Sequence, residues 1–76
     1  MTSRCHFLIE IEKERVRQDE KWGEQNHSDL KMYAILGEEF GEVGKAILED
    51  TDLKNELIQV ASVCMMWLEA IERRIR

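Results

Sequence analysis

The chain has 76 residues, of which 43% are hydrophobic and 36% are charged, and it contains no proline. We expect one domain over residues 1–76, because the composition is typical of a small helical protein rather than a disordered one. The 11 basic and 16 acidic residues give a formal net charge of −5. This charge argues against a nucleic-acid polymer as partner, but it still admits a phosphate ligand bridged by a cation.

The cysteines and the hydropathy pattern predict a cytoplasmic protein. Cys5 and Cys64 match no zinc-binding spacing, so we expect two free thiols in a reducing compartment, with Cys64 in the core. The start of the chain lacks the apolar segment of a secretory signal. The longest apolar run, around residues 63–68, is too short to span a bilayer, so we expect no membrane partner.

The first helix is predicted from about Thr2 to Lys21. Its weak apolar stripe consists of Leu8, Ile11 and Val16. Arg15 and Gln18 share the spacing of this stripe, so their side chains fall on its inward face. Arg15 then has two interpretations. We favour a solvated helix edge, because long charged side chains usually reach water; the alternative is a side chain that points into a polar site.

A polar loop follows the first helix. Gly23 is placed to end that helix in the left-handed conformation. Ser28 is a suitable cap for the next helix, and Asp29 suits its positive N-terminal end. Trp22 and His27 flank the loop, and each has an ordinary interpretation, as a lid on the core or as a loop histidine. An aromatic ring with amide and imidazole groups would equally suit a nucleotide.

The second helix is predicted from about Leu30 to Glu49 and contains three glycines, each of which costs ~1 kcal/mol relative to alanine. Gly37, Gly41 and Gly44 fall nearly on one line. We therefore expect another backbone or a bulky ligand to approach the helix there.

Three carboxylates lie beside this glycine line. Glu38, Glu39 and Glu42 share one broad face, because each helical residue turns by ~100°. Like charges at this spacing repel one another and destabilise the helix. A solvated acidic face is the ordinary interpretation, and a divalent cation bound by the oxygens is the functional one.

The third helix is predicted from about Leu53 to Arg74. The turn Asp50-Thr51-Asp52 is short, so the second and third helices should be antiparallel neighbours. This arrangement brings Glu56 and Gln59 towards the acidic face. The third helix is apolar on nearly all sides, and Arg73, Arg74 and Arg76 complement its C-terminal end. We expect an all-α antiparallel bundle of three main helices, completed by dimerisation, most simply about a two-fold axis.

These motifs resemble those of the MazG-like all-α nucleoside triphosphate pyrophosphohydrolases, particularly their short phage and prophage-type members. That family carries Glu-x-x-Glu on one helix and Glu-x-x-Asp on the next. Here Glu39-Phe40-Gly41-Glu42, preceded by the frequent extra acid Glu38, matches the first half, and Glu56-Leu57-Ile58-Gln59 occupies the second. The stretch Trp22-Gly23-Glu24-Gln25-Asn26-His27-Ser28 is similar to the Trp…Glu-Gln-x-His stretch that precedes the acidic helix in MazG domains.

The resemblance covers residues 8–72, and it implies hydrolysis of a (deoxy)nucleoside triphosphate to monophosphate and pyrophosphate with Mg²⁺ or Mn²⁺. The water nucleophile would be held by the metal or by Glu38. The implied catalytic residues are Glu38, Glu39, Glu42 and Glu56. The implied metal ligands are Glu39, Glu42 and Glu56, with Glu38 and Gln59 beside them. The implied substrate contacts are Lys21, Trp22, Gln25, His27 and Arg15.

Gln59 departs from the family pattern, because an amide ligates a cation without adding negative charge. We expect altered rather than lost activity, in a homo-oligomer that is a dimer or a tetramer. Two alternatives stay open. One is a nucleotide-binding protein without turnover, and the other is a non-catalytic helical module for dimerisation or regulation.

Overall fold

A computed structural model describes residues 2–75, which form three helices and no strand. The helices are α1 (Ser3–Trp22), α2 (Asp29–Glu49) and α3 (Leu53–Ile75). The prediction of an all-α protein is confirmed, and the predicted helix ends agree with the structure to within about one residue, which is the usual uncertainty of such boundaries. Arg76, which the sequence assigns to the last turn of the third helix, lies outside the described residues.

A side chain caps the beginning of each helix. Thr2 precedes α1, Ser28 precedes α2 and Asp52 precedes α3. The side-chain oxygen of each accepts a hydrogen bond of 3.2 Å from the backbone N–H three residues later. Such caps satisfy one of the backbone donors that a helix leaves unpaired at its start. The predicted role of Ser28 as a cap is thus confirmed.

Residues with positive φ end the first two helices. Gly23 follows α1 with φ 74° and ψ −168°, and its N–H donates to the Asp19 carbonyl at 2.8 Å. Its φ is positive as predicted, but its ψ is extended instead of left-handed helical. Asp50 ends α2 in the left-handed region, with φ 54° and ψ 48°.

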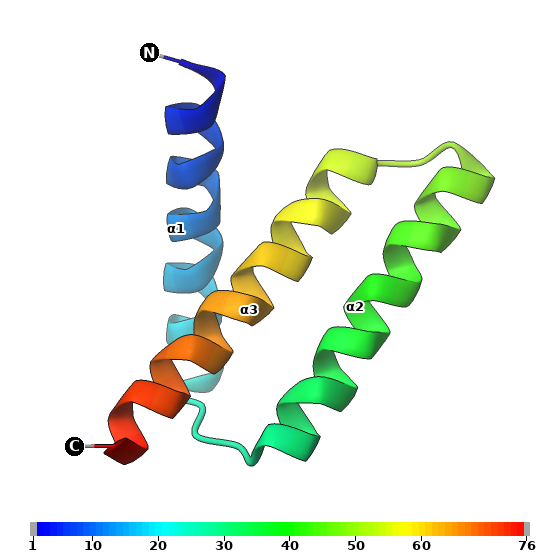
Figure 1. The fold of residues 1–76 in the computed structure, drawn as a ribbon. Coiled ribbons are helices and arrows are strands. Elements are labelled where there is room, and N and C mark those ends of the chain that lie inside the picture. Colours follow the sequence, from blue (N-terminus) through cyan, green and yellow to red (C-terminus); the bar gives the residue numbers. More distant parts are fainter. Residues whose placement is uncertain (1, 76) are drawn as a thin grey trace.

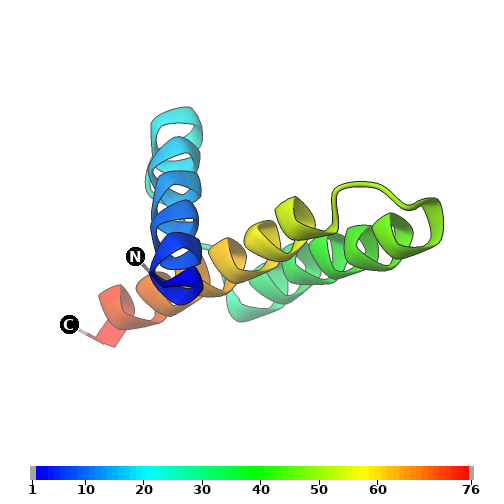
Figure 2. The same ribbon diagram turned by 90° about the horizontal axis from the view of Figure 1, so that it is seen from above.

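The two later helices form an antiparallel hairpin, as the short turn between them predicts (Figure 1). Within residues 2–75, α1 packs against α3 and not against α2, and it crosses α3 steeply behind the hairpin (Figures 1 and 2). The predicted antiparallel bundle is therefore right for α2 and α3 and wrong for α1. Because α3 is apolar on nearly all sides, α1 and α2 can pack against different faces of it.

The core lies between α2 and α3. Its buried residues are Met32, Val63, Met66 and Ala70, with Ile35, Leu36 and Trp67 packed around them. Both cysteines are free thiols as predicted, but Cys64 is half-buried instead of lying in the core. No helix within the described residues has the length and hydropathy needed to cross a bilayer.

Candidate functional site

The predicted acidic residues gather where α2 passes the first turns of α3. Glu39 and Glu56 are half-buried, whereas Glu38 and Glu42 are exposed. The pKa of Glu39 is raised above its ordinary value, first by burial and then by the negative charges of Glu56, Glu42, Glu38 and Glu14. The turn at residues 50–52 thus brings the two sequence motifs within electrostatic reach of one another.

No basic side chain of residues 2–75 forms an ion pair with Glu38, Glu39, Glu42 or Glu56. In that same part of the chain, no three acidic, histidine or cysteine side chains are grouped closely enough to hold a metal ion. A cation would therefore have to draw these carboxylates together. Their chemistry fits Mg²⁺, because hard cations take carboxylate and amide oxygens as ligands.

Glu14 of α1 belongs to this acidic group, and the sequence analysis missed it. Its half-buried carboxylate accepts hydrogen bonds from Arg17 at 2.9 and 2.5 Å and from Gln18 at 3.2 Å. Its pKa is lowered, chiefly by Arg17 and further by Gln59 and Gln18, against the opposing effect of burial. The available signal was its position four residues before Gln18, on the inward face of the first helix.

A pocket of about 260 Å³ adjoins the acidic group, between α1 and α2 and over the middle of α3. Glu39 belongs to the acidic group and also lines the pocket. The pocket is lined by Gln18, Trp22, Gln25, Ile35, Glu39, Gln59, Val63 and Met66. The pocket thus combines the aromatic ring of Trp22 with three side-chain amides, those of Gln18, Gln25 and Gln59. Its remaining lining is apolar except for Glu39. Such a lining suits a planar polar ligand.

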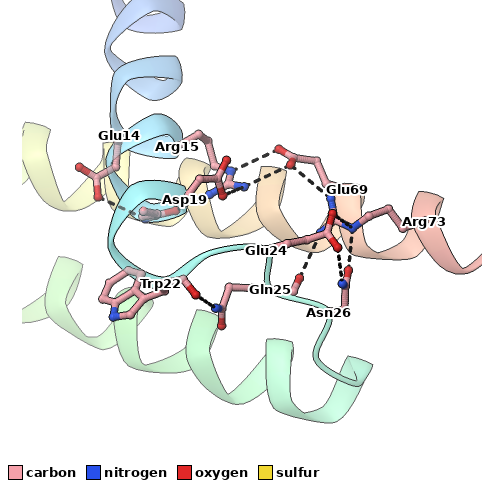
Figure 3. A network of polar contacts seen from close by, with 10 residues as sticks. Glu14, Arg15, Asp19, Trp22, Glu24, Gln25, Asn26, Glu69 and Arg73 are labelled. Atoms are coloured by element: carbon pink, nitrogen blue, oxygen red, sulfur yellow. Dashed lines mark hydrogen bonds and ion pairs between the residues drawn. The ribbon is translucent and has the colours of Figure 1, made fainter.

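Trp22 at the end of α1 and Gln25 in the following loop line this pocket, and His27 contacts Gln25. Trp22 is 54% exposed, so it is a pocket edge instead of a buried lid. The Gln25 amide donates to the Trp22 carbonyl at 3.0 Å (Figure 3). His27 contacts the Gln25 side chain at 2.5 Å but lines a different pocket, beside Arg73 at the end of α3.

The two predicted phosphate contacts have different surroundings. Lys21 is exposed, and its ammonium lies 4.8 Å from the centre of the Trp22 ring, at the edge of the pocket. Arg15 is buried and donates to Glu69 at 3.2 and 3.1 Å, to Asp19 at 2.9 Å and to Gln18 at 2.9 Å. The favoured interpretation of Arg15 as a solvated edge is wrong, because its side chain is buried and its charge pairs with carboxylates on two helices.

Arg73 fixes the loop that follows Trp22 and carries Gln25. Arg73 of α3 donates to the Asn26 side chain at 2.6 Å and to the Gln25 carbonyl at 3.2 Å (Figure 3). Arg73 also forms an ion pair with Glu24, in which Nε of the arginine lies 3.4 Å from Oε1 of the glutamate. The loop is therefore tied to the end of α3 by charged hydrogen bonds, which are the stronger kind.

The three helical glycines have open surroundings within the described chain. Gly37, Gly41 and Gly44 are exposed, and a Cβ atom added to any of them would meet nothing within 4 Å. The predicted close approach is therefore not made by another part of residues 2–75. An approach by a ligand or by a second chain stays a prediction.

Comparison of the chain with protein-family models, with curated proteins and with solved structures finds no match. The likeness to MazG-like proteins therefore rests on the quoted motifs. The site itself consists of an acidic group in which, among the described residues, Glu14 alone forms an ion pair, an adjoining pocket and the network that orients the loop.

Proposed function

We propose that this protein hydrolyses (deoxy)nucleoside triphosphates to a monophosphate and pyrophosphate in a reaction that depends on Mg²⁺ or Mn²⁺. The observation that carries the proposal is the position of Glu39, which lies at the centre of the acidic group and also lines the pocket. A triphosphate binds metal through its phosphates and binds a protein pocket through its base. A joint site of this kind suits both ends of such a molecule.

Glu39, Glu42 and Glu56 would hold the cation, with Glu38 and Gln59 as further oxygen donors. When bound, the ion supplies positive charge that offsets the charge of the phosphates and of the leaving pyrophosphate. The acidic group by itself repels a triphosphate, so substrate binding should require the ion. Exposed Glu38 is our candidate for orienting the attacking water.

The pocket residues would bind the nucleoside. Trp22 offers a ring face on which any base can stack, and such stacking is worth ~1–3 kcal/mol per base. Gln25 presents amide groups to the polar edge of the base, and His27 orients Gln25 through their hydrogen bond. Lys21 lies beside Trp22, where its charge can reach a phosphate. Arg15 holds α1 against α3, since its donors are already used within the chain.

The test is pyrophosphate release from a panel of ribo- and deoxynucleoside triphosphates with Mg²⁺ or Mn²⁺, and with EDTA as the blank. We expect metal-dependent release of pyrophosphate and monophosphate in equal amounts. The double variant Glu42→Gln/Glu56→Gln should lose this activity. The matched control Glu49→Gln/Glu72→Gln removes the same charge from exposed positions and should keep it. Equal turnover by both double variants would refute the metal assignment.

A second candidate function is nucleotide binding without turnover, and Gln59 is the observation that favours it. Its amide lowers the pKa of Glu14 and brings no charge to the acidic group. A folded protein that binds a nucleotide with Mg²⁺ by calorimetry, but releases no pyrophosphate from any member of the panel, would establish this alternative.

A further inference from the structure

The first helix is attached to the rest of the chain mainly through polar side chains. Within residues 2–75, α1 packs against α3 alone, which it crosses steeply (Figure 2). The two buried side chains of Ser3–Trp22 are Arg15 and Gln18, so no apolar side chain of α1 is buried. The core between α2 and α3 consists instead of buried apolar residues. The docking of α1 therefore lacks most of the hydrophobic stabilisation that holds the hairpin together.

The apolar residues of α1 add little to its contact with α3. Leu8 is 60% exposed, Ile9 42% and Val16 45%. Between the first half of α1 and the start of α3 lies an apolar hollow of about 210 Å³, lined by Phe7, Ile11, Lys54, Leu57 and Ile58. Facing side chains that leave such a gap lose part of the dispersion energy of close packing. The contact is therefore loose at this end of α1.

One ion pair joins α1 to α3 within the described chain, that of Arg15 with Glu69 (Figure 3). Nε of Arg15 donates to one carboxylate oxygen of Glu69 at 3.2 Å, and an Nη atom donates to the other oxygen at 3.1 Å. Paired hydrogen bonds of this kind are strong and require one geometry. Only 6% of the Arg15 side chain is exposed, so salt screens this pair less than a surface pair. We call the pair of Arg15 with Glu69 the latch.

Gly23 is the joint between α1 and a loop that is held independently of α1. It follows the last residue of α1 with φ 74°, a value that favours glycine. Beyond it, Arg73 of α3 donates to the Gln25 carbonyl and to the Asn26 side chain. A change of φ and ψ at Gly23 therefore turns α1 while the loop keeps its contacts with α3.

We propose that α1 is a hinged wall of the pocket, which turns about Gly23 when the latch opens while α2 and α3 stay packed. The helix α1 supplies Gln18 and Trp22 to the pocket, whereas the loop, α2 and α3 supply its other lining residues. Arg15 also donates to Gln18 at 2.9 Å, so the latch and this pocket side chain belong to one hydrogen-bonded group. Opening of the latch thus takes one side of the pocket away from the acidic group, and the pocket is complete only while the latch is closed.

Amide hydrogen exchange distinguishes a hinged α1 from a chain that unfolds as one unit. An isolated helix of 20 residues is marginal in water, so the amides of an undocked α1 exchange. In wild type, we expect the amides of α1 to exchange roughly tenfold or more faster than those in the middle of α2 and α3, relative to their intrinsic rates. Exchange in α1 should also respond less to low concentrations of urea, because opening of α1 exposes less surface than global unfolding. The protein is measured in EDTA without nucleotide, so the result does not depend on whether it is an enzyme.

Two variants show which contacts break when α1 opens. Arg15→Ala removes the latch, which is broken in the open state and in the unfolded state alike, so it should speed exchange in all three helices by roughly thirtyfold. Ser28→Ala removes the cap of α2, which the open state keeps. It should speed exchange in the middle of α2 and α3 by about fivefold and leave exchange in α1 unchanged.

The matched control for Arg15→Ala is Arg17→Ala, the same substitution on the same helix. Arg17 pairs with Glu14 within α1, so its loss leaves the contact with α3 in place. Exchange in α1 should then change by about twofold or less.

Equal protection and equal urea dependence of all three helices in wild type would overturn the proposal. So would an increase of about fivefold in the exchange of α1 amides in Ser28→Ala, or a rate in α1 of Arg15→Ala no higher than in Arg17→Ala. The first two results come from proteins that keep the latch, so the test stays decisive if Arg15→Ala unfolds.

Discussion

Glu56 of α3 lies close enough to Glu39 of α2 that its charge is, after burial, the largest contribution to the raised pKa of Glu39. This relation joins the two sequence motifs across the hairpin. It also means that the folded chain holds a carboxylate whose ionised form is disfavoured. Such a group costs stability at neutral pH unless a ligand compensates its charge.

The first prediction concerns pH. Because folding raises the pKa of Glu39, its contribution to stability is present at low pH and is lost as pH rises through that pKa. Metal-free protein should therefore melt at a higher temperature slightly above the ordinary glutamate pKa than at neutral pH. The carboxylates of Glu14 and Asp29 have lowered pKa values, so they oppose this trend only at still lower pH.

The variant Glu39→Gln checks the source of this pH dependence. It should raise stability at neutral pH by roughly 0.5–1 kcal/mol, because it relieves several like-charge contacts, and it should flatten the pH profile. Thermal melts in EDTA between mildly acidic and neutral pH give both quantities. An unchanged profile in Glu39→Gln would assign the pH dependence to another group.

The second prediction concerns Arg15. Replacing it with alanine removes its hydrogen bonds to Gln18, Asp19 and Glu69, so Arg15→Ala should destabilise the protein by about 2–3 kcal/mol. Urea unfolding measures this cost. Lys13→Ala is the control, because Lys13 forms an exposed ion pair with Glu10 whose loss should cost less than about 0.5 kcal/mol. If Arg15→Ala and Lys13→Ala destabilised the protein equally, the buried hydrogen bonds of Arg15 would contribute no more to stability than an exposed ion pair.

The third prediction compares one substitution at two serines. Ser62 is fully buried in α3, and its hydroxyl has no hydrogen-bond partner among residues 2–75. Ser62→Ala should therefore be neutral or stabilising by up to about 1 kcal/mol. Ser28→Ala removes the cap of α2 and should destabilise by about 1 kcal/mol. Destabilisation by Ser62→Ala would reveal a hydrogen bond or a ligand that this hydroxyl serves.

The fourth prediction concerns Gln59. Gln59→Asp places a new negative charge beside Glu14 and Glu39, so it should lower the melting temperature in EDTA. With Mg²⁺ the same charge becomes an added ligand, and the metal-induced rise in melting temperature should exceed that of wild type. A smaller metal-induced rise than in wild type would place Gln59 outside the metal's reach.

The sequence predicts the parts of this fold that depend on local chemistry. Apolar spacing gives the helices, and short polar side chains such as Ser28 and Asp52 give their starts. The convergence of Glu39 with Glu56 follows from the shortness of the turn between their helices. Each of these features is determined by a few neighbouring residues.

The position of α1 could not be predicted in the same way. Because α3 is apolar on nearly all sides, its pattern does not say which face α1 takes. The extended ψ of Gly23 then directs the loop, and a glycine permits many such angles. The burial of Arg15 and the position of Glu14 in the acidic group both depend on how α1 crosses α3. The spacing of residues in the sequence therefore could not predict them.

The central claim is that the acidic group binds a divalent cation, and thermal melting with and without MgCl₂ tests it most directly. We predict that Mg²⁺ raises the melting temperature, by an amount that corresponds to about 2.7 kcal/mol in the free energy of unfolding when Mg²⁺ is at a hundred times its Kd. The rise should be absent in Glu42→Gln/Glu56→Gln and present in Glu49→Gln/Glu72→Gln. An equal rise in NaCl of the same ionic strength, or in both double variants, would contradict the account.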